Sequence, residues 1–241
     1  MKHNILENKN CLITGATGGL GQEISKEMII RGCNLFLTGR SDKKLEKLKK
    51  QLVKTNRNVN IWYQKGDLES IDDIKNIIKY AKQKMNNVDI LINCAGYFLI
   101  KKFMDNNLKD FEKSFKINIR APYLLSKEFC KGMLEKKWGR IVNIGSSSSY
   151  AGFKETTIYC SSKHAVLGLS RAMHDELKIH NIRTFCISPG SIKTDMGKQV
   201  KNQDFSSFIE PKEIAEYIGF ILSFDDNMIS EEVRLNRVII K

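Results

Sequence analysis

Tyr159 and Lys163 stand four residues apart, a spacing that places two side chains on the same face of a helix. A free phenol has a pKa of about 10, and a nearby ammonium favours the phenolate and brings proton exchange closer to neutral pH. The pair is therefore a candidate for proton transfer. The spacing alone is weak evidence, because the same Y-x-x-x-K pattern begins at four other tyrosines, Tyr80, Tyr97, Tyr123 and Tyr150.

A serine placed thirteen residues before the tyrosine distinguishes Tyr159 from the other four. Ser146 follows the apolar run at residues 141–144, which is typical of a buried strand. At the same distance, the other tyrosines are preceded by Asp67, Lys84, Asp110 and Lys137. We therefore select Ser146, Tyr159 and Lys163 as candidate catalytic residues, although residues 146–149 taken alone are equally compatible with a polar loop.

A glycine-rich segment at residues 14–21 could bind a phosphate group. It follows a short apolar run and precedes helical periodicity, so it predicts a strand, a tight turn and a helix in succession. Glycine allows close approach of a ligand to the backbone, and a helix N-terminus attracts an anion such as a pyrophosphate. The spacing of Gly15, Gly19 and Gly21 differs from the usual G-x-G-x-x-G fingerprint, so a turn without a ligand remains an alternative.

The elements that would position these residues alternate regularly along the chain. Apolar runs predict strands at residues 11–14, 33–38, 59–63, 88–92, 140–144, 182–187 and 232–240. Helical patterns lie between them, including long helical regions at residues 108–136 and 156–180 and a helix that begins at Pro211. The sequence therefore predicts one α/β domain over residues 1–241, a doubly wound parallel sheet flanked by helices on both faces.

The notable motifs follow the predicted strands directly. The glycine segment, Arg40, Asp67, residues 93–96, Ser146 and the Pro189–Gly190 turn each come at the carboxyl end of a strand. In a parallel sheet of this kind, the carboxyl ends meet at one edge, where ligands bind. Such placement favours a single functional site over motifs distributed at random along the chain.

Composition excludes several other classes. The 241 residues are 41% hydrophobic and include no apolar run long enough to span a bilayer. Residues 1–10 are polar, so no signal peptide is expected, and six scattered cysteines without paired spacing predict free thiols and no metal site in a reducing cytoplasm. The net charge of +13 arises mostly from lysines on polar helix faces, so nucleic-acid binding is not expected.

In order and spacing, the chain resembles the short-chain dehydrogenase/reductase family at residues 14–21 and 93–96, at Asn118, Ser146, Tyr159 and Lys163, and at Pro189–Gly190. The resemblance implies a Rossmann-type fold and an NAD(P)-dependent oxidoreductase. It implies that Tyr159 is the general acid in reduction, that Lys163 holds the ribose hydroxyls and lowers the tyrosine pKa, and that Ser146 hydrogen-bonds the substrate carbonyl. Asn118 would organise a proton-relay water, although it could also be a polar residue that distorts its helix.

The same resemblance implies which residues hold the cofactor. They are Gly15, Thr17, Gly18, Gly19, Leu20, Gly21, Asp67, Leu68, Asn93, Ala95, Gly96, Tyr159, Lys163, Pro189, Gly190, Ile192 and Thr194. Asp67 and Leu68 would contact the adenine, and Asn93, Ala95 and Gly96 would border the adenosine ribose and fix the fourth strand. Ile192 and Thr194 would face the nicotinamide carboxamide.

Arg40 and Ser41 predict a preference for NADP(H). The second strand lacks the acidic residue at its end that would hold a ribose 2′-hydroxyl in an NAD site. Arg40 can form charge-assisted hydrogen bonds to a 2′-phosphate, with help from the Ser41 hydroxyl. A solvated arginine at a helix start is the alternative, and Gly18 stands where many NADP-dependent relatives have a second basic residue.

The substrate is the least determined part of the prediction. Residues 136–146 look most like 3-oxoacyl-thioester reductases, and an acidic acyl carrier protein would suit the positive charge. A sugar or polyol dehydrogenase is the rival, because the tail contains Asn236-Arg237 where relatives often have a glycine-rich segment. A cofactor-binding regulator without catalysis is a third possibility, but its mark would be a broken catalytic tetrad, and the tetrad is intact.

A homotetramer or dimer is expected. The two long helical regions contain Phe129, Met133, Leu169 and Met173, more apolar side chains than one sheet would bury, and in the family the equivalent helices pair between subunits.

Overall fold

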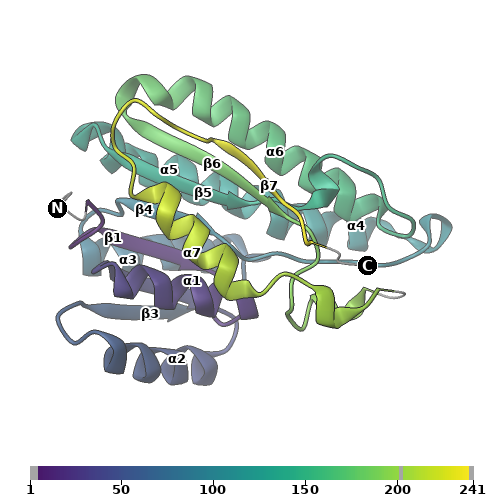
Figure 1. Ribbon diagram of the computed structural model, residues 1–241, viewed down its shortest axis with the longest axis horizontal. Helices are drawn as coiled ribbons and strands as arrows, with labels where there is room; N and C mark the ends of the chain where they lie inside the picture. The colour runs from purple at the N-terminus through teal and green to yellow at the C-terminus, as the bar shows by residue number, and fades with distance from the viewer. Residues whose placement is uncertain (1–4, 201–202, 239–241) are drawn as a thin grey trace.

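Seven parallel strands form the centre of the computed structural model, which describes residues 5–200 and 203–238 (Figure 1). The strand order is β3-β2-β1-β4-β5-β6-β7, so the winding reverses between β1 and β4. The strands are β1 Asn10–Thr14, β2 Asn34–Gly39, β3 Ile61–Lys65, β4 Ile90–Asn93, β5 Gly139–Ile144, β6 Ile182–Pro189 and β7 Glu232–Leu235. The doubly wound parallel sheet predicted from the sequence is confirmed.

Helices cover both faces of this sheet. Apolar residues of α1 (Gly19–Ile30), α2 (Asp42–Thr55) and α7 (Pro211–Leu222) join one buried cluster, and α7 lies along α1 in Figure 1. A second cluster on the other face includes residues of α3 (Ile71–Met85), α5 (Ala121–Lys136) and the C-terminal half of α6 (Thr157–Leu177). The continuous apolar strands are buried between the two layers, as parallel strands require.

Local sequence explains where the helices of the first half begin. Ser41 caps α2 by accepting a hydrogen bond from the backbone N–H of Lys44, and Ser70 caps α3 in the same way. In α2, the buried positions are Leu45, Leu48 and Leu52, and lysines occupy most of the exposed face. The +13 net charge is thus partly a solvated helix face, as the sequence indicates.

The long helical region expected at residues 108–136 is interrupted. It consists of α4 (Leu108–Phe115), a π-helical turn (Lys116–Arg120) and α5. The Asn118 side chain bonds to the backbone of Tyr97 on a neighbouring segment, and π turns of this kind occur frequently at functional sites. The last strand is also shorter than expected, since β7 ends at Leu235, and residues 239–241 lie outside the described part of the chain.

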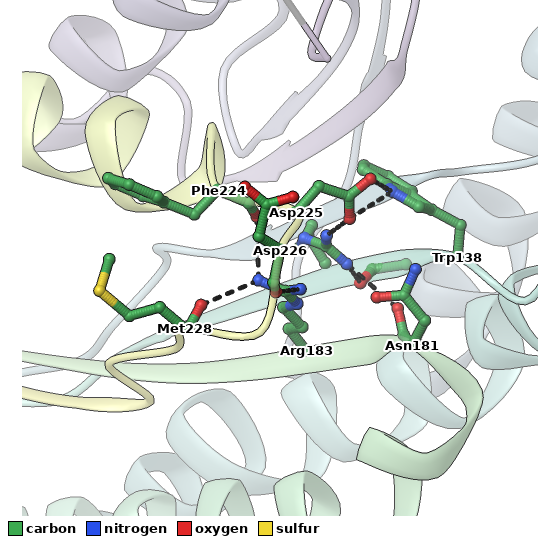
Figure 2. Close-up of polar contacts among 9 residues, drawn as sticks. Trp138, Asn181, Arg183, Phe224, Asp225, Asp226 and Met228 are labelled. Carbon is green, nitrogen blue, oxygen red and sulfur yellow. Dashed lines mark hydrogen bonds and ion pairs between the residues drawn. The ribbon is translucent and has the colours of Figure 1, made fainter.

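The amino ends of β5 and β6 are joined to the loop that precedes β7 by two arginines (Figure 2). Arg140 pairs in register with Arg183. Arg183 donates to the backbone oxygens of Phe224, Asp226 and Met228, so one guanidinium organises the loop between α7 and β7. The arginine pair therefore fixes the return of the chain to the sheet edge.

Two structural features are absent from the described residues. No helix within residues 5–200 and 203–238 is long and apolar enough to cross a membrane. In the same part of the chain, no three His, Cys, Asp or Glu side chains gather as metal ligands would. All six cysteines are free thiols.

Candidate active site

The carboxyl ends of the strands open into a cavity of about 1360 Å³. Of the twenty-one site residues predicted from the sequence, eighteen line this cavity. The exceptions are Ser41, Asn93 and Asn118. Sequence positions as distant as Gly15 and Thr194 therefore meet in one place, as expected for the edge where parallel strands end.

The glycine segment forms a cradle that side chains would fill. Gly15 has a φ of +65°, and a Cβ there would lie 2.7 Å from the Cα of Ala95. A Cβ on Gly21 would lie 2.2 Å from the carbonyl oxygen of Gly15, and one on Gly19 would meet the Thr194 methyl group at 2.8 Å. The backbone can adopt this path only with glycines. The first turn of α1 then faces the cavity without a side-chain cap, which suits a pyrophosphate.

Tyr159 and Lys163 project from the first two turns of α6 toward the opposite half of the cavity. Both side chains are almost fully buried. The Lys163 Nζ lies 5.7 Å from the centre of the tyrosine ring and donates a 2.7 Å hydrogen bond to the carbonyl oxygen of Ile144, at the end of β5. The lysine thus ties α6 to the strand that precedes Ser146.

Burial decides the protonation of both groups. It raises the pKa of Tyr159 to about 12, while a hydrogen bond with Ser146 acts in the opposite direction. Burial also lowers the pKa of Lys163 to about 8. The sequence-based expectation that the ammonium brings the phenol pKa down is therefore not met, because loss of hydration outweighs the other effects. A phenol that stays protonated at neutral pH suits a proton donor.

Ser146 starts a turn, residues 147–149, that aims its side chain at the tyrosine. Its Oγ accepts the backbone N–H of Ser148 at 3.1 Å, and its own N–H donates to the Ser149 Oγ at 3.2 Å. These bonds leave the Ser146 hydroxyl hydrogen free to point into the cavity, close to Tyr159. Two hydroxyl donors on one side of a cavity can both reach a single carbonyl oxygen.

The geometry of the Tyr–Lys pair does not by itself identify the site. The ammonium-to-ring distance is 5.3 Å for Tyr80 and 5.9 Å for Tyr123, close to the value for Tyr159. Neither Tyr80 nor Tyr123 lines the cavity, and Tyr150 does not line it either. Tyr97 does, but its lysine, Lys101, is engaged by Asp110 at 2.6 Å. Location therefore separates Tyr159 from Tyr80, Tyr123 and Tyr150, and the Lys101–Asp110 pair separates it from Tyr97.

Comparison with known proteins agrees with this geometry. Residues 9–204 match the short chain dehydrogenase family, which is four fifths of the chain. The protein belongs to that family. As a family member, it is an NAD(P)-dependent oxidoreductase that acts on CH–OH and C=O groups.

Individual relatives of this short chain dehydrogenase are distant. An uncharacterized oxidoreductase of Staphylococcus aureus is 28% identical over 234 residues, 97% of this chain and 99% of the relative. A 3-oxoacyl-[acyl-carrier-protein] reductase of Rickettsia typhi is 29% identical over 224 residues, 89% of each chain. Among solved structures, a metagenomic short-chain oxidoreductase in complex with NADP superposes with a TM-score of 0.85 at 24% identity, over 97% of this chain and 99% of that one.

Two predicted site residues lie behind the cavity wall of this dehydrogenase. Asn93 donates to the Oδ1 of Asn143 at 2.8 Å, which fixes β4 against β5. The Asn118 Oδ1 accepts the backbone N–H of Tyr97 at 2.8 Å, and its Nδ2 donates to the Tyr97 carbonyl at 3.0 Å. The Asn118 amide is therefore occupied by protein groups, whereas the buried Oδ1 of Asn93 has no hydrogen-bond partner among the described residues. The proton-relay water assigned to Asn118 by resemblance stays a prediction.

Sequence reasoning missed two basic residues of the cavity wall that accompany Arg40. Ser41 caps α2 and does not line the cavity, whereas Lys44 and Lys47 do, together with Arg40. The helical period of α2 could have signalled the two lysines, because Lys44 and Lys47 are three residues apart on the helix that follows Arg40 and so share one side.

Apolar residues of the cavity wall were also missed. Phe98 packs edge-on against Tyr159, with ring centres 4.7 Å apart. Four further apolar side chains, Ile100, Phe153, Met196 and Phe205, line the cavity alongside polar ones such as Lys154 and Gln203. They come from three separate segments, so only the fold brings them together.

Proposed function

We propose that this protein is an NADP(H)-dependent carbonyl reductase whose best substrate is a 3-oxoacyl thioester. The observation that carries the proposal is a buried Tyr159 hydroxyl, protonated at neutral pH, beside the Ser146 hydroxyl in a cavity that also contains the glycine cradle. The cradle fits the pyrophosphate of a dinucleotide, and the cofactor supplies the hydride when bound.

The protein's own groups provide the proton and the orientation. Tyr159 donates its hydroxyl proton to the carbonyl oxygen, and the Ser146 hydroxyl donates a hydrogen bond to the same oxygen as charge develops on it. Lys163 stands behind the tyrosine ring, held by the Ile144 carbonyl, where its ammonium stabilises the phenolate left after proton transfer. Phe98 shields the tyrosine from water on its ring edge.

The preference for NADP(H) rests on three cations. Arg40, Lys44 and Lys47 line the cavity, and none of them forms an ion pair with another residue in the described ranges. By contrast, Lys50 on the same helix is engaged by Glu46 at 2.6 Å. A 2′-phosphate between unpaired cations gains charge-assisted hydrogen bonds that the 2′-hydroxyl of NAD(H) lacks.

Cofactor binding tests that preference directly. We expect Arg40→Ala and Lys44→Ala each to weaken NADPH binding by about tenfold to a hundredfold, since hydrogen bonds to charged groups contribute roughly 1.5–3 kcal/mol, and to leave NADH binding unchanged. Lys43→Ala is the control, because Lys43 is exposed on α2 and does not line the cavity. An unchanged NADPH-to-NADH preference in Arg40→Ala, measured by cofactor fluorescence, would show that the assignment is wrong.

Apolar side chains in the cavity wall support an acyl substrate. Phe98, Ile100, Phe153, Met196 and Phe205 offer apolar contacts to an acyl chain, alongside polar residues such as Lys154 and Gln203. The similarity to the Rickettsia typhi 3-oxoacyl-[acyl-carrier-protein] reductase and the +13 charge both favour a thioester on an acidic acyl carrier.

A screen of NADPH oxidation over 3-oxoacyl thioesters, ketones, sugars and quinones tests the substrate class. We expect the highest kcat/KM for the thioesters. Carrier-linked thioesters should lose kcat/KM as salt rises, whereas small thioesters should not, because screening weakens only the carrier's charge attraction. Faster turnover of sugars would refute the thioester assignment, and a flat salt response would refute the acidic carrier.

We also propose a homodimer or homotetramer in the cytoplasm. Phe129 and Met133, two residues on which the sequence-based expectation relied, are buried within the single chain. The remaining support is a group of exposed apolar side chains at Phe103, Met104, Leu108 and Phe111. Six free thiols suit a reducing compartment. A monomeric mass by light scattering at micromolar concentration would contradict the assembly.

A further inference from the structure

Ser162 lies on α6 between Tyr159 and Lys163, yet it does not line the cavity. Its side chain is completely buried. The Ser162 Oγ donates a 2.8 Å hydrogen bond to the carbonyl oxygen of Tyr159 and accepts a 2.9 Å bond from the Nδ2 of Asn118. One hydroxyl thus joins the backbone of the tyrosine's helical turn to the π turn that contains Asn118.

Asn118 extends this link to the cavity wall. Its amide forms bonds with both the N–H and the carbonyl of Tyr97, at 2.8 and 3.0 Å. Tyr97 follows Gly96 at the carboxyl end of β4, and both residues line the cavity. A continuous chain of hydrogen bonds therefore runs from Tyr159 through Ser162 and Asn118 to the segment opposite the tyrosine.

The Ser162 bond differs from the usual serine bond in a helix. Serines inside helices often donate to the carbonyl four residues back, as Ser161 does to Thr157 and Ser170 does to Val166. Ser162 donates three residues back, to the carbonyl of Tyr159 itself. Ser161 is exposed and has no bond to another element among the contacts described, so its hydroxyl bonds only within α6.

We propose that Ser162 is a positioning residue for Tyr159: it holds the tyrosine's turn of α6 against Asn118 and so sets the hydroxyl against Ser146. The proposal rests on the assignment of Tyr159 as proton donor above. Removal of the Ser162 hydroxyl leaves the Tyr97 bonds of Asn118 in place but releases α6 from them. A misplacement of a reacting group by about 1 Å can cost about 10²-fold in rate.

Alanine variants at three serines of α6 test the proposal. We expect Ser162→Ala to lower kcat about tenfold with KM for NADPH unchanged, because a misplaced donor slows the chemical step and not binding. Ser161→Ala should retain kcat. Ser170→Ala loses a different buried bond, from the Nδ2 of Asn143, so it should lower the melting temperature and retain kcat. Equal kcat in the Ser161 and Ser162 variants would overturn the proposal.

A double-mutant cycle separates positioning from general loosening. If Ser162 acts through Asn118, Ser162→Ala should cost little additional kcat in an Asn118→Ala background. The same fold-loss in both backgrounds would overturn the proposal. Ser162→Cys fills the site with a weaker hydrogen-bonding group and should give an intermediate kcat, which remains measurable if the alanine variant folds poorly.

Two substitutions distinguish the positioning role of Ser162 from the proton-donor role of Tyr159. A normal kcat in Tyr159→Phe would refute the proton-donor assignment, and with it the basis of this proposal. A collapse of kcat in Tyr159→Phe together with a normal kcat in Ser162→Ala would refute the positioning role alone.

Discussion

A cation is buried near each end of β5 and β6, and the two cations differ in how many protein groups bind them. At the amino end, the fully buried Arg140 is engaged by Asp225, by the carbonyls of Gly139 and Asn181 at 2.8 and 3.1 Å, and by the Trp138 ring (Figure 2). At the carboxyl end, the buried Lys163 donates a hydrogen bond to the Ile144 carbonyl and faces a cavity.

The difference shows which buried charge is structural. Burial and, less strongly, the charge of Arg183 lower the pKa of Arg140 from 12.5 to about 10, with Asp225 acting against the shift, so the guanidinium stays charged. Burial lowers the pKa of Lys163 to about 8, with no carboxylate among the groups that offset it. A buried charge without an anionic partner costs stability, and such sites are often functional. We therefore expect mutations at the amino end to change stability and mutations at the carboxyl end to change activity.

The strongest test of the carboxyl end is Tyr159→Phe. This change removes only a hydroxyl, so cofactor binding should survive, but kcat should fall about 10²–10⁴-fold with the loss of general acid catalysis. The matched controls are Phe substitutions at Tyr80, Tyr97, Tyr123 and Tyr150, which should retain most of their turnover. Tyr97→Phe could alter KM, because Tyr97 lines the cavity. A collapse of kcat in a folded control variant would contradict the assignment.

The strongest test of the amino end is Arg140→Ala. We expect a loss of about 3–5 kcal/mol in the free energy of unfolding, since truncation empties a buried site and leaves Asp225 without its partner. The kcat of the folded enzyme should not change. Arg171→Ala removes the exposed Arg171–Glu232 pair and should cost at most about 1 kcal/mol. Denaturant unfolding measures the loss of stability in each variant. Similar losses in both would show that the buried Arg140 is no more important to stability than the exposed Arg171.

The pH dependence of stability sharpens the comparison at Lys163. Because its pKa falls from 10.5 to about 8 on folding, the unfolded chain holds an extra proton between these values, and stability rises with pH across that window. The cost of the buried charge is fully present below about pH 8. Lys163→Met should therefore be more stable than the wild type by a margin that shrinks from about pH 8 to 10.5. A margin that stays constant with pH would contradict the shifted pKa.

The smallest expected effect is at Trp138. Trp138→Phe keeps an aromatic face for Arg140 and loses only the indole hydrogen bond to Asp225, which has Nε1–O distances of 3.2 and 3.3 Å. We expect a loss of about 0.5–1.5 kcal/mol and no change in kcat. Thermal unfolding measures the first and steady-state kinetics the second. A fall in kcat would show that the two ends of the strands are coupled.

Local sequence patterns determine much of this architecture, and for that reason it could be predicted from the sequence. Runs such as residues 90–92 and 141–142 must be strands buried on both faces, and the period of α2 fixes which side carries its leucines. The glycine spacing requires a close backbone approach, and the structure shows one at Gly15 and Gly21. Since the carboxyl ends of parallel strands share one edge, the order of the motifs was enough to gather them at one cavity.

The features that the sequence did not predict depend on contacts between distant segments. The spacing of Tyr159 and Lys163 could not reveal the direction of the tyrosine pKa shift, because burial is set by everything that packs around α6. The π turn at Asn118 depends on the Tyr97 backbone, and the pairing of Arg140 with Arg183 depends on the register of β5 and β6. Sequence spacing determined which groups share a face, and only the tertiary structure decided which of them lost their water.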